Sequence, residues 1–278
     1  VTAKPEIHWF DPAFKKDPGD ADKRADRLWN EADAKAIVEA VRGRSATVTE
    51  EAKPSSQACP GLYDLTTLQR EANSRFGFSA KTTLSLAQAL YEKHKVLTYP
   101  RTDSRALPED YLGAVTEAMQ ALDKRYQPFV KTVLKNKWVR PNKRIFNNAK
   151  ISDHFAIIPT SQPPKTLSEA EAKVYDLVTK RFLAVFFPPA EFQITTRITR
   201  VDNEPFKSEG KVMVNPGWLE IYGKEAETDD TPGLVPVVAK ETPKVKEIAV
   251  DALQTKPPAR YSEATLLSAM EGAGKLVD

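Results

Sequence analysis

The sequence predicts an α+β protein of more than one domain, in which a discontinuous β-rich domain carries an inserted, mostly α-helical domain. Residues 66–187 place apolar side chains at helical spacing between residues that cap helices. Residues 6–10, 45–49 and 192–198 have the pattern of strands and flank this helical middle. Since strands need a shared core, we expect both ends of the chain to build one β domain.

The first part of the chain mixes strand and helix patterns. Residues 6–10 predict a short strand, and Asn30 can cap a helix that Gly43 ends. Residues 45–49 predict a second strand, and residues 53–60 predict a linker.

The middle of the chain predicts four helices. The threonines at residues 66–67 can cap the first, and Ser79 can cap the second. The third is expected to begin at residues 107–110, where a proline suits the first turn. Ser168 and Glu171 have the spacing of a capping box and predict the start of the fourth.

The last part of the chain predicts strands. Residues 192–198 alternate between apolar and polar side chains, which indicates a half-buried strand. Asp202 and Asn203 supply a turn after it. Residues 212–214, 218–222 and 245–250 predict further strands.

Composition excludes several classes of protein. The chain has 278 residues, of which 41% are hydrophobic and 28% charged, the balance of a folded soluble protein. It contains no apolar run long enough for a membrane span and no secretory leader, so we expect no membrane partner. A single cysteine, Cys59, excludes an internal disulfide and suggests a cytoplasmic protein. The oligomeric state stays open.

The positive charge is concentrated in the middle of the chain. The net charge is only +3, yet residues 63–188 carry 20 basic and 12 acidic side chains. Residues 124–152 contain nine basic residues and no acidic one. This asymmetry indicates an anionic partner, with nucleic acid the usual one. A solvated basic face explains the charge equally well.

Two segments carry candidate catalytic residues. In residues 96–105, the side chains of Tyr99 and Arg101 are expected to point to the same side of an extended backbone. A tyrosine hydroxyl beside a guanidinium suits attack on a phosphodiester, because the guanidinium neutralises the phosphate oxygens. His154 precedes an apolar run and could donate to the same phosphate. Spacing alone also fits a packed tyrosine and a structural histidine.

Five segments, taken in order along the chain, resemble type IA DNA topoisomerases and are most similar to the topoisomerase III branch. These segments are residues 62–73, 87–95, 97–103, 152–160 and 257–266. The resemblance implies that Tyr99 is the nucleophile that forms a 5′-phosphotyrosine link to one DNA strand. It implies that Arg101 and His154 hold the scissile phosphate, and that Gln88 and Glu92 lie near the DNA. The implied activity changes DNA topology by cutting and religating one strand without ATP.

The resemblance also implies how the chain is divided. Residues 1–62 and 189–255 would form a β-rich arch domain, and residues 63–188 the helical tyrosine domain inserted into it. Residues 256–278 would begin the return to a base domain. The family's N-terminal domain, which binds Mg²⁺, has no counterpart in this sequence. We therefore expect a fragment that holds no metal ion itself, needs that domain as a partner and is nearly inactive alone.

A non-catalytic module that binds single-stranded nucleic acid is the main alternative, with Tyr99 stacking on a base. A metal-dependent nicking enzyme is disfavoured because His8, His94 and His154 lack the spacing of a metal pair. Either main hypothesis has single-stranded DNA as the partner. The residues expected to contact DNA are Arg70, Gln88, Glu92, Lys131, Lys135, Arg140 and Arg144.

Overall fold

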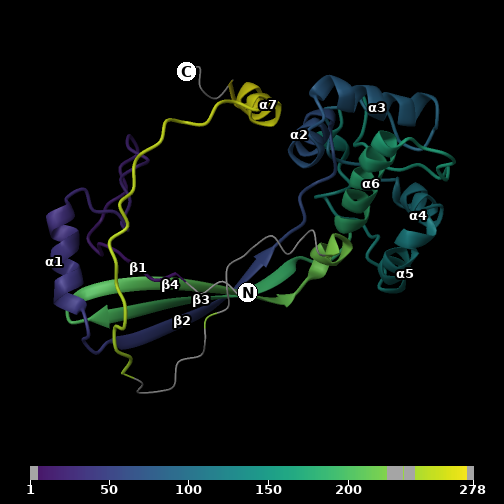
Figure 1. Ribbon diagram of the computed structural model, residues 1–278. Helices are drawn as coiled ribbons and strands as arrows, with labels where there is room; N and C mark the ends of the chain where they lie inside the picture. Colours follow the sequence, from purple (N-terminus) through teal and green to yellow (C-terminus); the bar gives the residue numbers. More distant parts are fainter. Residues whose placement is uncertain (1–5, 224–233, 235–241, 274–278) are drawn as a thin grey trace. The chain divides into compact units, whose positions relative to one another are not determined.

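The computed structural model describes residues 6–223, 234 and 242–273, and the chain divides into two compact units. The first unit consists of Val1–Ser56, Glu191–Asn215 and Glu227–Pro258. The second consists of Gln57–Ala190, Pro216–Ala226 and Ala259–Asp278. The first contains the sheet and the second most of the helices (Figure 1), so the mixed α/β class predicted from the sequence is confirmed.

A four-stranded sheet forms the centre of the first unit. Its order is β1 (His8–Trp9), β4 (Glu204–Asn215), β3 (Ala190–Val201) and β2 (Thr47–Gln57). β3 and β4 form an antiparallel hairpin in which Val201 pairs with Glu204. Helix α1 (Glu31–Val41) begins at Asn30, whose side chain accepts a hydrogen bond from the Ala32 amide as expected of a cap. Its last residue, Val41, is buried with Val201 in the core of this unit.

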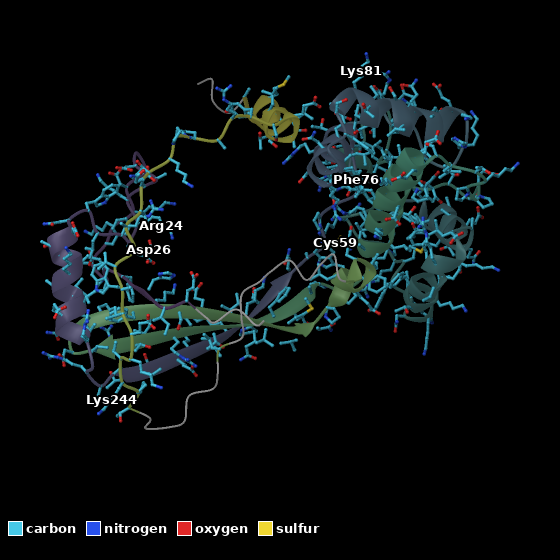
Figure 2. The ribbon with its side chains drawn as sticks, in the orientation of Figure 1. Arg24, Asp26, Cys59, Phe76, Lys81 and Lys244 are labelled. Atoms are coloured by element: carbon cyan, nitrogen blue, oxygen red, sulfur yellow. The ribbon has the colours of Figure 1, made fainter. Side chains whose placement is uncertain are left out.

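β2 differs from its sequence prediction. The strand continues to Gln57 through residues for which we expected a linker, and Pro54 lies within it. β2 is the last strand of the sheet, and an edge strand tolerates a residue that cannot donate to a neighbour. The strand predicted at residues 245–250 is wrong. Among residues 242–250, only Lys244 (labelled in Figure 2) pairs, in an isolated bridge with Ser45.

Five helices account for most of the second unit. They are α2 (Leu65–Phe76), α3 (Ala80–Glu92), α4 (Leu112–Gln120), α5 (Gln127–Lys135) and α6 (Glu169–Ala184). Figure 1 shows them gathered around α6. Leu68 from α2, Leu90 from α3 and Val174 and Val178 from α6 belong to one buried cluster. The 3.6-residue spacing of apolar residues therefore identified the faces that make this core.

Capping residues locate the helix starts well. Ser79 caps α3, and Ser168 with Glu171 forms the predicted capping box of α6. The cap predicted for α2 is wrong. It is Asp64, whose carboxylate accepts a hydrogen bond from the Thr67 amide at 2.7 Å. The Asp64 amide donates to the Thr67 hydroxyl, so the capping box is completed by an aspartate two positions before Thr66.

Tertiary contacts explain the remaining differences. α4 begins at Leu112, not at residues 107–110, since the Leu107 and Glu109 amides donate to residues 145–148 instead of starting a helix. The strand predicted at residues 218–222 is a 3₁₀ helix, η3 (Gly217–Ile221). Gly217 has a φ of +50°, and a Cβ there would lie 2.3 Å from the Pro189 carbonyl oxygen. This close approach turns the chain where the pattern indicated a strand.

Helix α7 (Glu263–Gly272) packs against α2 through polar contacts. The Glu263 carboxylate accepts a hydrogen bond from the Ala80 amide at the start of α3. Glu271 lies 3.5 Å from Arg70. Within the part of the chain that the structure describes, no helix combines the length and the apolar character needed to cross a bilayer.

Candidate active site

The segment that carries Tyr99 lies beside the segment that follows His154. The Thr98 amide donates to the Ile158 carbonyl at 3.0 Å, and the Thr98 hydroxyl donates to the Ala156 carbonyl at 3.0 Å. An isolated antiparallel bridge continues this pairing one residue earlier. Two motifs that are far apart in the sequence are therefore held together by backbone hydrogen bonds.

Tyr99 and His154 are in direct ring contact. Their ring centroids are 4.2 Å apart and the planes are tilted by 43°. Tyr99 is half-buried and His154 is exposed. Among the described residues, neither the Tyr99 hydroxyl nor the His154 ring has a hydrogen-bond partner. Both polar groups are thus available to a ligand.

Arg101 is held by Gln88 of α3, which is itself held by Glu92. Its guanidinium Nη2 donates to Gln88 Oε1 at 3.2 Å, and Gln88 Nε2 donates to Glu92 Oε1 at 2.9 Å. Gln88 and Glu92 are one helical turn apart, which places both on one face of α3. The Arg101 side chain is exposed, so its remaining donors face solvent. The relay orients the guanidinium without covering it.

Sequence reasoning missed the residues that hold this segment in place. Thr102 donates through its hydroxyl to the His154 carbonyl at 2.8 Å, and Ser104 donates to the Lys150 carbonyl at 2.8 Å. Thr102 and Ser104 are both buried. Arg101, directly before Thr102, and Asp103, between the two, are exposed. The only signal of this role in the sequence is the spacing of these two small polar residues. Side chains two residues apart point to the same side of an extended backbone.

A hollow of about 300 Å³ opens beside Tyr99. Its lining residues are Tyr91, Lys95, Leu97, Thr98, Tyr99, Phe155 and Thr160. Tyr91 meets Tyr99 edge to face, with ring centroids 5.4 Å apart. The wall is therefore mostly aromatic and aliphatic, with one lysine.

The other candidate DNA-binding residues lie away from this group. Lys131 and Lys135 are exposed on α5, and Arg140 and Arg144 are exposed in the loop that follows. None of these four forms an ion pair with a residue that the structure describes. Arg70 differs, because its guanidinium already faces Glu271. The structure brings none of the five into contact with Tyr99.

Residues suited to a metal ion are not gathered in the described regions. No group of three or more histidine, cysteine or acidic side chains there could hold an ion. Type IA topoisomerases are generally Mg²⁺-dependent, and Mg²⁺ prefers carboxylate and water oxygens in octahedral geometry. The described residues do not fit this ion.

A tyrosine in ring contact with a histidine, with an exposed guanidinium two residues further along the chain, suits binding of a phosphodiester and attack on it. The sequence of the chain matches a known family. The family model for DNA topoisomerase matches residues 5–274, and the chain belongs to this family.

The most similar relatives point to one branch of it. The chain is 46% identical over 262 residues to DNA topoisomerase 3 of Bacillus cereus and 41% identical over 261 residues to that of Bacillus subtilis. Each alignment covers 91% of this chain and 36% of the relative, so the chain spans about a third of their length. Full-length topoisomerase I from Thermotoga maritima has a similar fold, with a TM-score of 0.65 and 22% identity over 98% of this chain and 45% of that chain.

Proposed function

We propose that the chain is the strand-cleaving part of a type IA DNA topoisomerase of the topoisomerase III branch. The observation that carries the proposal is the ring contact between Tyr99 and His154, with Arg101 two residues from the tyrosine. The whole protein would cut one DNA strand, let another strand pass and reseal the cut. Single-stranded DNA is the partner, and the protein acts in the cytoplasm.

The chemistry assigned to these residues is a transesterification. The Tyr99 phenolic oxygen attacks phosphorus, and a new O–P bond forms as the P–O bond to the deoxyribose 3′ oxygen breaks. The phenol's proton ends on that 3′ oxygen, and the phosphate stays on Tyr99 as a 5′-phosphotyrosine. Arg101 and His154 hold the non-bridging oxygens, where negative charge develops. Reversal needs no ATP, because the ester keeps the energy of the broken bond.

The organisation of the whole protein is part of the proposal. Residues 63–188 would be the tyrosine domain, inserted into an arch made by residues 1–62 and 189–255, and residues 256–278 would lead toward a base domain. A further, metal-binding domain would supply Mg²⁺ and the proton transfer. The proposal agrees with the described residues, in which no group of acidic, histidine or cysteine side chains could hold a metal ion.

The test supplies the metal-binding domain of a close relative in trans, with Mg²⁺ and a labelled single-stranded oligonucleotide. A covalent adduct resistant to denaturation is expected with the unmodified chain. Tyr99→Phe should abolish it. The control Tyr111→Phe should retain it, because Tyr111 is a half-buried tyrosine directly before α4 and is not assigned to the site. An adduct that persists in Tyr99→Phe overturns the assignment. Binding without any adduct favours the non-catalytic module.

A further inference from the structure

We propose that the hollow beside Tyr99 receives the base of the nucleotide whose 5′ phosphate becomes attached to the tyrosine. The inference rests on the proposed function, because that function defines which nucleotide is tethered there. The inference adds a base-binding subsite to the proposed function, which by itself needs only the contacts to the phosphate.

The position of the hollow is the first argument. The Tyr99 side chain, which would carry the phosphate, is itself part of the wall. His154 is in ring contact with Tyr99, and Arg101 follows Tyr99 by two residues, so both would hold the phosphate oxygens close to the tyrosine. The tethered nucleotide therefore has its sugar and base within reach of the hollow, and no other nucleotide is fixed so closely.

The lining is the second argument. Tyr91, Tyr99 and Phe155 contribute aromatic rings, and Leu97 contributes an aliphatic side chain. Single-stranded nucleic acids are bound by stacking bases on aromatic side chains, which every base allows. Tyr111 packs against Phe155 with ring centroids 4.9 Å apart and holds that ring in place. The hollow is thus built for a flat, mostly apolar group.

Lys95 places a positive charge at this wall. Its ammonium nitrogen lies 5.6 Å from the centre of the Tyr91 ring. Its backbone has a φ of +58°, a left-handed conformation that is unfavourable for lysine. The Thr160 hydroxyl donates to the Lys95 carbonyl at 2.6 Å and fixes this conformation. A cation held over an aromatic wall suits an anionic strand whose base enters the hollow.

The experiment compares three 5′-phosphorylated single-stranded oligonucleotides with a fluorescent dye at the 3′ end. One is intact, one lacks the base of its first nucleotide, and one lacks the base of its fifth. All carry the same charge. Anisotropy titration of the full chain is expected to show about tenfold weaker binding when the first base is missing, and a much smaller change when the fifth is missing.

Two variants test whether the preference for the first base comes from the hollow or from another part of the protein. Tyr91→Ala should reduce the tenfold preference for the first base to near one. Phe76→Ala is the matched control, because Phe76 (labelled in Figure 2) is also half-buried and lies 6.0 Å below a lysine nitrogen but does not line the hollow. It should keep the preference. The comparison of oligonucleotides on the unmodified chain stands even if a variant fails to fold.

Three results would overturn the inference. Equal binding of the intact oligonucleotide and the one without the first base shows that the hollow takes no base, while DNA binding remains. Loss of the preference in Phe76→Ala as well shows that the effect is not local to the hollow. Absence of binding to all three removes the subsite together with the DNA-binding role of this chain. Failure of the proposed cleavage is seen separately, in the adduct test with Tyr99→Phe.

Discussion

A buried arginine joins α6 to α2 and to the segment that precedes α2. Arg181 is 7% exposed, and its guanidinium donates to Glu71 at 2.6 Å and to the Gly61 carbonyl at 3.1 Å. It also lies over the Tyr63 ring, 4.4 Å from the centre, and donates to the Tyr222 hydroxyl. Burial raises the pKa of Tyr222 to about 12, so this phenol remains a neutral acceptor.

Arg181→Met should destabilise the protein by about 1.5–3 kcal/mol, the range for hydrogen bonds to charged groups. The substitution keeps most of the volume but removes one donor from the half-buried Glu71 carboxylate, which keeps its contact with Arg75, and removes the guanidinium donor from the Gly61 carbonyl. Urea unfolding followed by far-ultraviolet circular dichroism measures the effect. Lys173→Met is the control, because Lys173 is exposed, pairs with the exposed Glu169 and lies 6.0 Å from the centre of the Phe76 ring, and should change stability by less than about 0.5 kcal/mol. Equal losses in the two variants would show that burial does not strengthen the Arg181 contacts.

Single residues of the site were predictable only in part. Tyr99, Arg101 and His154 were identified by resemblance, because their spacing alone also fitted packed residues. The contact between Tyr99 and His154 depends on backbone pairing between segments about 60 residues apart, such as that of Thr98 with Ile158. Local patterns carry no information on such pairing. Thr102 was missed for the same reason, since its partner is a distant carbonyl group.

At the scale of elements, α6 depends on its capping box. The Glu171 carboxylate accepts hydrogen bonds from the Ser168 amide and hydroxyl, both at 2.8 Å, and lies 3.1 Å from His94 Nε2. These contacts, of which the Ser168 amide is the strongest, lower the pKa of Glu171 from 4.5 to about 2. The box therefore joins the start of α6 to the end of α3.

Glu171→Gln should lower stability by about 1 kcal/mol at pH 7, the usual value of a helix cap. A carboxyl whose pKa is depressed on folding stabilises the protein above its unfolded pKa. That contribution disappears as the pH falls from about 4.5 toward 2. Urea unfolding at several pH values in this window should therefore show that the free energy of unfolding falls less on acidification in Glu171→Gln than in the unmodified chain. Glu169→Gln, on the exposed first turn, is the control, and a matching pH profile there would refute the assignment to Glu171.

Helices were predicted better than strands for a physical reason. A helix start is encoded locally, as Ser79 and Ser168 show, because the cap and its amide partner are three residues apart. A strand depends on a partner elsewhere in the chain. Residues 245–250 have a strand pattern but no neighbouring strand in the described sheet, and residues 218–222 are turned by the close approach of Gly217 to Pro189. Helix α5 was not predicted, although its sequence lies inside the basic stretch.

At the scale of the whole molecule, the question is what the basic stretch contacts. The sequence left two interpretations open, a phosphate-binding surface and a solvated face. The structure shows that Lys143 is paired with Glu109 at 2.6 Å and Arg125 lies 3.7 Å from Asp176. The other basic side chains of the stretch have no ion-pair partner among the described residues. Four of them are the residues expected from the sequence to contact DNA, namely Lys131, Lys135, Arg140 and Arg144.

Changing these four residues together to glutamine should weaken binding to single-stranded DNA and reduce its salt dependence. Each phosphate contact on a single strand contributes about 0.7 to the slope of log affinity against log salt, so four contacts contribute about 3. Titration at several salt concentrations measures this slope.

The matched control changes four basic residues that already face acidic partners in the first unit, namely Lys23, Lys35, Arg42 and Lys53. Both variants lose the same formal charge, so a long-range effect of net charge would lower both slopes equally. A fall of about 3 in the first variant alone indicates direct phosphate contact, and an unchanged slope in it identifies the basic stretch as a solvated face.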